Sequence, residues 1–287
     1  MTITQSANDL IAGFEDTLAL TCEATKGPFF AGVDLGTANI VTAVVDTSGV
    51  PVAGVLTRSR STVRDGLVLD YMGAITILRQ QVNTLKNAGY NLDLASAAFP
   101  PGTTGRNCET FANVLRAVGL EVAGLIDEPS AAALVLDIRE GAVVDVGGGT
   151  TGISVLQDGQ VIYTADEATG GLHLDLVIAG HYKISVEDAE KMKNDPKSQS
   201  ELFSVVRPVF QKMASIVRQH LRGHQVKDIY LVGGTSCFPG MDKVMADETQ
   251  LEVFLPHNPL LVTPLGIALS CSREARNLVP KRKAASK

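Results

Sequence analysis

The chain has 287 residues, 45% of them hydrophobic and 20% charged, which suits one large packed domain or two ordinary ones and excludes disorder over the whole length. Its net charge of −6 argues against a nucleic-acid-binding protein, and no apolar run approaches the ~18 residues that cross a bilayer. The four cysteines form no C-x-x-C pair, which argues for a reducing, cytosolic compartment and against a zinc site.

Residues 1–28 form a segment of their own. Apolar residues recur there at helical spacing and predict a short amphipathic helix, with the stripe Leu10, Ile11, Phe14 and Leu18. Gly27 and Pro28 then break the helix. No basic region precedes an apolar one, so a secretory signal is not predicted. Two interpretations remain open: the helix packs on the chain's own domain, or it docks on another protein from a linker.

The next segment, 29–139, alternates strands with helices. Three strands in a meander come first, at 29–35, 39–46 and 51–58. Helices are then predicted at 71–89, 105–119 and 128–138, and they alternate with strands at 92–100 and 120–127. A Thr-Ser-Gly turn joins the second strand to the third. Strands that alternate with helices indicate an α/β fold.

The same order restarts in the segment 140–275. Another three-strand meander is predicted at 141–147, 151–157 and 160–168. Three helices follow, at 170–182, 185–195 and 201–222. The segment ends with a strand at 228–234, a helix from about 239, a strand at 252–256 and a last helix at 263–277. Pro208 is expected to kink or break the long helix. The basic segment 276–287 reads as a frayed tail. A repeat of this length predicts two similar halves with a cleft between them.

Each half begins with a strand that ends in an aspartate, a turn rich in glycine and threonine, and a second strand. The two aspartates are Asp34 and Asp145, which are 145 − 34 = 111 positions apart. A carboxylate at a strand end can hold a hydrated Mg²⁺ ion, and the N–H groups of a glycine turn can hold phosphate oxygens. One such turn is weak evidence, because Asp-Gly turns between strands are common. Two in register predict a cleft that binds the phosphates of a nucleotide from both sides.

Six motifs in order over residues 32–270 resemble those of the actin-like ATPase superfamily, which includes actin and the DnaK-type chaperones. They read GVDLGTAN, IDEPSAAALV, VVDVGGGTTG, AEKMK, IYLVGGTSCFPGM and TPLGIALS. Within the superfamily, VRDGLVLDYMGAITILR, FPPGTTGR, TADEATGGLHL and FQKMASIVRQHL resemble the EutJ-type family of ethanolamine-utilisation proteins. The resemblance implies two actin-like (ribonuclease-H-like) lobes around a nucleotide cleft, with the outer subdomains reduced, and ATP with Mg²⁺ as cofactors.

The resemblance also implies a role for each matched residue. Asp34 and Asp145 hold the metal through water. The two phosphate turns match Gly36, Thr37 and Asn39, and Gly147, Gly148, Gly149, Thr150 and Thr151. The turn against ribose and adenine matches Gly233, Gly234 and Thr235, and a clamp on the nucleoside matches Glu190 and Lys193. Since Glu190 and Lys193 stand three residues apart on one helix face, a plain surface salt bridge is the alternative.

Glu128 matches the glutamate that orients the attacking water in the chaperone ATPases, although it also sits where an acid compensates a helix dipole. Other positions depart from the DnaK-type pattern. Gly152 stands where that pattern has an aspartate, Ala38 replaces a threonine, and the DnaK-type catalytic lysine has no aligned counterpart. These departures predict nucleotide binding with slow Mg²⁺-dependent hydrolysis.

Three functions compete on the sequence alone. The resemblance favours an ATP-binding, chaperone-like protein that assists ethanolamine-utilisation enzymes or microcompartment shell proteins, in the cytoplasm or with a bacterial microcompartment. A filament-forming scaffold ATPase of the same fold is the second candidate, and a small-molecule kinase is the third. No insertion large enough for a kinase substrate domain is found in the sequence, and the short outer segments disfavour large filament contacts.

Overall fold

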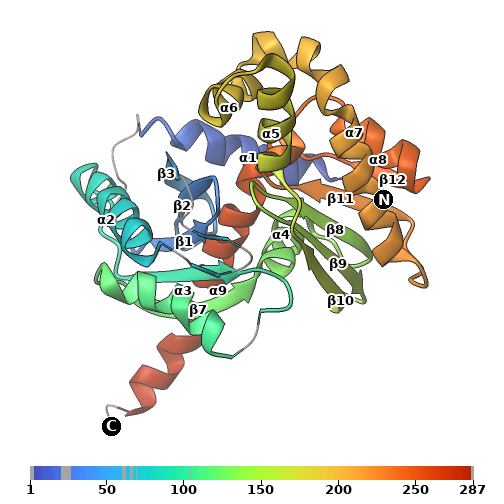
Figure 1. Ribbon diagram of the computed structural model, residues 1–287. Coiled ribbons are helices and arrows are strands. Elements are labelled where there is room, and N and C mark those ends of the chain that lie inside the picture. The colour runs from blue at the N-terminus through green and yellow to red at the C-terminus, as the bar shows by residue number, and fades with distance from the viewer. Residues whose placement is uncertain are drawn as a thin grey trace.

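The chain forms two lobes, each built on one five-stranded sheet (Figure 1). The structure is a computed structural model that describes residues 3–20, 27–59, 63–64, 67–68, 70–103 and 105–285. The predicted linker after the first helix therefore lies mostly outside the described residues, as do residues 286–287. The predicted α/β class with two similar halves is confirmed.

The first sheet has the order β3-β2-β1-β6-β7. Its strands are β1 (Phe30–Leu35), β2 (Asn39–Val45), β3 (Pro51–Arg58), β6 (Leu94–Phe99) and β7 (Glu121–Asp127). The first three strands pair antiparallel, and β6 and β7 join in parallel with β1. Parallel neighbours require a crossover, which the helices α2 (Tyr71–Asn87) and α3 (Arg106–Ala117) provide. A separate two-stranded hairpin joins β4 (Val63–Arg64) to β5 (Leu67–Val68).

The second sheet repeats this order as β10-β9-β8-β11-β12. Its strands are β8 (Gly141–Val146), β9 (Thr151–Gln157), β10 (Gln160–Glu167), β11 (Asp228–Val232) and β12 (Glu252–Phe254). Four helices cover its outer face: α5 (Gly171–Tyr182), α6 (Val186–Asn194), α7 (Pro196–Leu221) and α8 (Met241–Thr249). Two short 3-10 turns complete the lobe, η1 (Gly234–Cys237) and η2 (Pro259–Leu261).

Two helices lie between the sheets, α4 (Glu128–Leu136) and α9 (Val262–Ala285) (Figure 1). Although α9 follows the second lobe in the chain, it packs on β1 and β2 of the first sheet as well as on α4. Glycines permit this close packing. A Cβ atom on Gly266 would overlap the carbonyl oxygen of Ala131 in α4, and one on Gly32 in β1 would overlap the backbone of Ala268. The lobes are therefore joined through backbone contact.

The predicted N-terminal helix is α1 (Gln5–Thr17), and it packs on the chain's own fold. Ile11 and Phe14 are fully buried, and Phe14 lies against Gly54 of β3. The polar face of the helix contacts the second lobe, where Glu15 receives hydrogen bonds from His257 and Asn258 near η2. The apolar stripe is thus covered by the first lobe, as the first of the two interpretations expects.

Two helices are longer than the sequence predicts. Helix α7 begins at Pro196, because Asp195 caps it by accepting a hydrogen bond from the backbone N–H of Lys197, and it continues past Pro208 without a break. Helix α9 runs to Ala285, through most of the predicted tail. No helix among the described residues is both long enough and apolar enough to cross a membrane.

Candidate functional site

The two glycine turns meet each other across the gap between the lobes. The first joins β1 to β2 and the second joins β8 to β9. Gly148 and Gly149 of the second turn lie against Ala38 and Thr37 of the first, so closely that a Cβ on Gly149 would come within 3.1 Å of the Thr37 hydroxyl. Gly148 leaves no room for a Cβ atom beside Ala38, and Gly149 leaves only a tight fit beside Thr37, so glycine lets the two turns approach each other.

The second turn is held from both sides by its own lobe. The carbonyl oxygen of Gly147 accepts hydrogen bonds from the backbone N–H of Gly171, at 3.0 Å, and from the hydroxyl of Thr235, at 2.8 Å. The carbonyl oxygen of Gly148 accepts one from Leu172, at 2.8 Å. Because its carbonyls bond to the start of α5, the turn has a fixed shape before any ligand binds.

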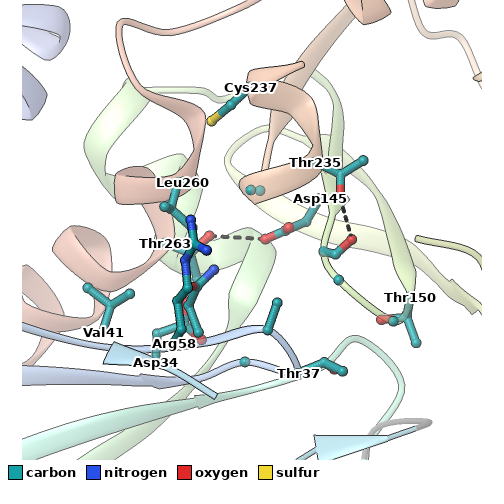
Figure 2. A pocket seen from close by; sticks show the side chains of 18 of the residues that line it. Asp34, Thr37, Val41, Arg58, Asp145, Thr150, Thr235, Cys237, Leu260 and Thr263 are labelled. Carbon is teal, nitrogen blue, oxygen red and sulfur yellow. Dashed lines mark hydrogen bonds between the residues drawn. The ribbon is translucent and has the colours of Figure 1, made fainter. Parts of the chain in front are cut away.

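A cavity of about 470 Å³ lies between the turns, within the range of small-molecule sites. The predicted residues that line it are Asp34, Gly36, Thr37, Asn39, Glu128, Asp145, Gly147, Gly148, Gly149, Thr150, Glu190, Lys193, Gly233, Gly234 and Thr235. Figure 2 shows Asp34 and Thr37 on one side, and Asp145, Thr150 and Thr235 on the other. Thr151 does not line the cavity, since it is fully buried and its hydroxyl donates to the carbonyl oxygen of Thr169.

Three carboxyl groups converge at one end of the cavity. Burial, with the nearby charge of Asp145, raises the pKa of Asp34 to about 7. Burial also raises the pKa of Asp145 to about 6, although the hydroxyl of Thr263 donates a hydrogen bond to this carboxylate at 3.1 Å. The pKa of Glu128 is raised well above its usual range, first by burial and then by Asp145 and Asp34. Such groups favour a cation that would balance their charge.

The donor set fits a hydrated magnesium ion better than a dehydrated metal. Among the described residues, no group of three or more His, Cys, Asp or Glu side chains could hold a metal ion directly. Mg²⁺ usually keeps several waters and is held through one or two carboxylates together with substrate phosphates. Asp34 and Asp145, which share one cavity, could hold it in this way.

Glu128 occupies the first position of α4, directly after the capping residue Asp127, whose side chain accepts a hydrogen bond from Ser130. The dipole of α4 therefore favours a negative charge at Glu128. The side chain lines the cavity beside Asp34 and Asp145. This placement is compatible with both roles predicted for Glu128, which are to compensate the helix dipole and to orient the attacking water.

The side of the cavity that Lys193 lines contains an ion pair that the sequence did not reveal. The ammonium group of Lys193 lies 2.8 Å from the carboxylate of Asp175 in α5 and donates a weaker hydrogen bond to the carbonyl oxygen of Gly171, at 3.3 Å. Both side chains of the pair are largely buried.

The predicted turn residue Gly233 also requires glycine. It has a φ of +89° and lies so close to Asp145 and Val146 that no side chain would fit.

Among the polar residues of the site that sequence reasoning missed are Arg58, Asp175 and Thr263. The signal for Asp175 was a lone carboxylate in the apolar run GLHLDLVIAG. Thr263 opens the predicted last helix and the motif TPLGIALS, but the sequence predicted no contact between its side chain and the site. Arg58 ends a strand that belongs to no motif.

Comparisons with known proteins give a consistent result. The family model of the type IV pilus assembly protein PilM matches residues 136–264, and that of MreB/Mbl proteins matches residues 56–195. The ethanolamine utilization protein EutJ of Escherichia coli is 43% identical over 91% of this chain and 92% of its own. The crystal structure of EutJ from Carboxydothermus hydrogenoformans is 45% identical, with a TM-score of 0.85 over 92% of this chain and 99% of that chain.

A more distant structure has the same fold and a bound nucleotide. MreB5 of Spiroplasma citri, bound to AMPPNP, has a TM-score of 0.71 over 90% of this chain and all of its own, at 19% identity. Its likeness supports the fold alone. The identity and coverage of the E. coli protein, with the matching architecture, place the chain more narrowly. The chain belongs to the EutJ family of ethanolamine-utilisation proteins, within the actin-like ATPase superfamily.

Proposed function

We propose that the chain binds ATP with magnesium in the cavity between its lobes. The observation that carries this proposal is the pair of glycine turns that face each other there, each with an aspartate, Asp34 or Asp145, at the end of its strand. The turns' backbone N–H groups and the hydroxyls of Thr37 and Thr150 supply donors for phosphate oxygens. The bound magnesium ion supplies positive charge to the phosphate oxygens.

Slow hydrolysis follows from the same arrangement. Glu128 orients a water whose oxygen forms a bond to the γ-phosphorus while the bond from this phosphorus to the bridging oxygen breaks, which gives ADP and phosphate. Glu128 accepts a hydrogen bond from this water. Slow turnover is expected because Gly152 carries no carboxylate at the position where the DnaK-type motif has one.

Calorimetric titration with ATP and magnesium tests the site. Wild-type protein is expected to bind in the micromolar range, and Asp145→Ala is expected to abolish binding at these concentrations. Asp247→Ala, which removes an exposed carboxylate on α8, is the matched control. Equal affinity in wild type and Asp145→Ala contradicts the assignment of the site.

In the cell, we propose that the nucleotide state controls assistance to enzymes of ethanolamine utilisation or to shell proteins of their microcompartment. Membership in the EutJ family of ethanolamine-utilisation proteins supports this proposal. Affinity capture from cells grown on ethanolamine, with and without ATP, tests this role. Recovery of these proteins in one nucleotide state only supports it. Sedimentation of the protein into polymers on addition of ATP favours the scaffold ATPase instead.

A further inference from the structure

The charged side chains that line the cavity are mostly acidic. They are Asp34, Glu128, Asp145 and Glu190, against the cations Arg58 and Lys193. The charge of Lys193 is already balanced by Asp175, at 2.8 Å. The side chain of Arg58 makes no hydrogen bond or ion pair with a residue that the structure describes, and it is exposed to the cavity and solvent. Arg58 is therefore the lining cation that is available to a bound anion.

The backbone of Arg58 is held beside the first glycine turn. Arg58 is the last residue of β3 and pairs in register with Asn39, where β2 begins. The next residue, Ser59, donates a backbone hydrogen bond of 2.8 Å to the carbonyl oxygen of Ala38 within the turn. Residues that lie directly opposite each other on antiparallel strands have Cβ atoms about 5 Å apart. The side chain of Arg58 is long enough to cover this distance to Asn39 and the turn.

The side chain of Arg58 leaves the sheet on the face that borders the cleft. Leu56, two residues earlier and hence on the same face, also lines the cavity. Asn39, opposite Arg58, has its side-chain nitrogen 4.0 Å from where a Cβ of Gly234 would lie, across the cleft in the second lobe. Figure 2 shows Arg58 among the side chains that line the cavity, as Asp34, Thr263 and Leu260 do.

We propose that Arg58 binds the phosphate chain of the nucleotide, a proposal that rests on the proposed ATP site. A guanidinium group is always charged and presents a planar fork of donors that matches two phosphate oxygens at once. Its position beside the first turn puts this fork where the phosphates would lie between the two turns. The first lobe thereby has a cation, although the sequence offers no counterpart for the DnaK-type lysine.

Calorimetric titration with MgATP, comparing wild type with Arg58→Gln and Arg58→Lys, tests the proposal. A charge-assisted hydrogen bond contributes about 1.5–3 kcal/mol, so Arg58→Gln is expected to weaken MgATP binding about 10- to 100-fold. Arg58→Lys should recover part of this loss, because lysine keeps the charge but not the fork. Arg116→Gln, which removes an exposed arginine of α3, should change nothing.

Equilibrium dialysis with radiolabelled adenosine separates the phosphates from the nucleoside. Arg58→Gln should leave adenosine binding unchanged, and an equal loss for adenosine and MgATP would mean that Arg58 contacts the nucleoside. Unchanged MgATP affinity in Arg58→Gln would overturn the proposal while the ATP site stands. Failure of the wild type to bind MgATP would instead overturn the proposed function. Equal melting temperatures of all variants exclude misfolding as the cause.

Discussion

Gly148 of the second lobe lies directly against Ala38 of the first, since a Cβ atom on Gly148 would come within 2.8 Å of the Cβ atom of Ala38. Real Cβ atoms do not approach so closely, and neither group can turn aside. We therefore expect Gly148→Ala to push the two turns apart and to weaken MgATP binding about tenfold, which corresponds to 1.4 kcal/mol. Calorimetric titration measures this change.

A compensating variant makes the test specific. The double variant Ala38→Gly with Gly148→Ala removes the clash and should restore binding. Gly180→Ala, in α5 with no atom near its added methyl group, is the control for glycine replacement as such. Loss of binding in the double variant equal to that in Gly148→Ala would show that contact between the turns is not the cause.

The raised pKa of Asp34 makes stability depend on pH in the absence of ligand. In the folded chain this pKa is about 7, against 3.8 ordinarily, so between these values the folded state binds more protons than the unfolded state. The free energy of unfolding therefore falls as pH rises through this window. Asp34→Asn removes the titration. Its melting temperature should match that of wild type near pH 4 and exceed it at pH 8.

Magnesium and ATP should reverse this order. A bound cation favours the ionised carboxylate, so ligand should stabilise wild type more than Asp34→Asn at pH 8. Thermal melting at pH 4, 6 and 8, with and without MgATP, measures both effects. If the difference in melting temperature between the two proteins does not change with pH, Asp34 does not titrate in this window.

Glu128→Gln should slow hydrolysis about a hundredfold while MgATP binding stays unchanged, because an amide is a poorer acceptor for a water's proton but has the same shape. Single-turnover release of phosphate, with calorimetric titration beside it, separates these two quantities. Glu252→Gln, on the exposed edge strand β12, is the control. Equal phosphate release by wild type and Glu128→Gln would leave Glu128 with a role in the structure of α4 only.

Phe14→Ala should lower the free energy of unfolding by about 3–5 kcal/mol, because Phe14 is fully buried between α1 and the first sheet. Asp16→Ala, on the exposed side of the same helix, should have little effect. Chemical unfolding followed by circular dichroism measures both. An unchanged melting temperature after removal of residues 1–25, together with loss of co-purification with microcompartments, would favour the docking interpretation of this helix instead.

The sequence predicted the order of elements because both sheets have strong local signals. Short apolar runs separated by turns that contain glycine mark the meanders, and the duplicated aspartates Asp34 and Asp145 mark the cavity. The sequence analysis placed the start of α7 at residue 201 and missed its first turn, although proline is well suited to the first helical position after a cap such as Asp195.

The missed contacts are those that only the tertiary structure creates. Asp175 and Lys193 are 18 residues apart and lie on different helices, so no spacing rule pairs them. Arg58 reaches the cavity because β3 ends beside the first turn, a matter of register between strands. Such pairings depend on how elements pack and not on the period of apolar residues within one element.

The position of α9 has a consequence for how the chain folds during synthesis. Among the described elements this helix is synthesised last, yet it covers β1, which is among the first. The first lobe therefore cannot complete its core until α9 has been synthesised, so β1 and β2 keep an apolar face uncovered until then. Contacts between such distant segments also slow folding, because the intervening chain must close a long loop first.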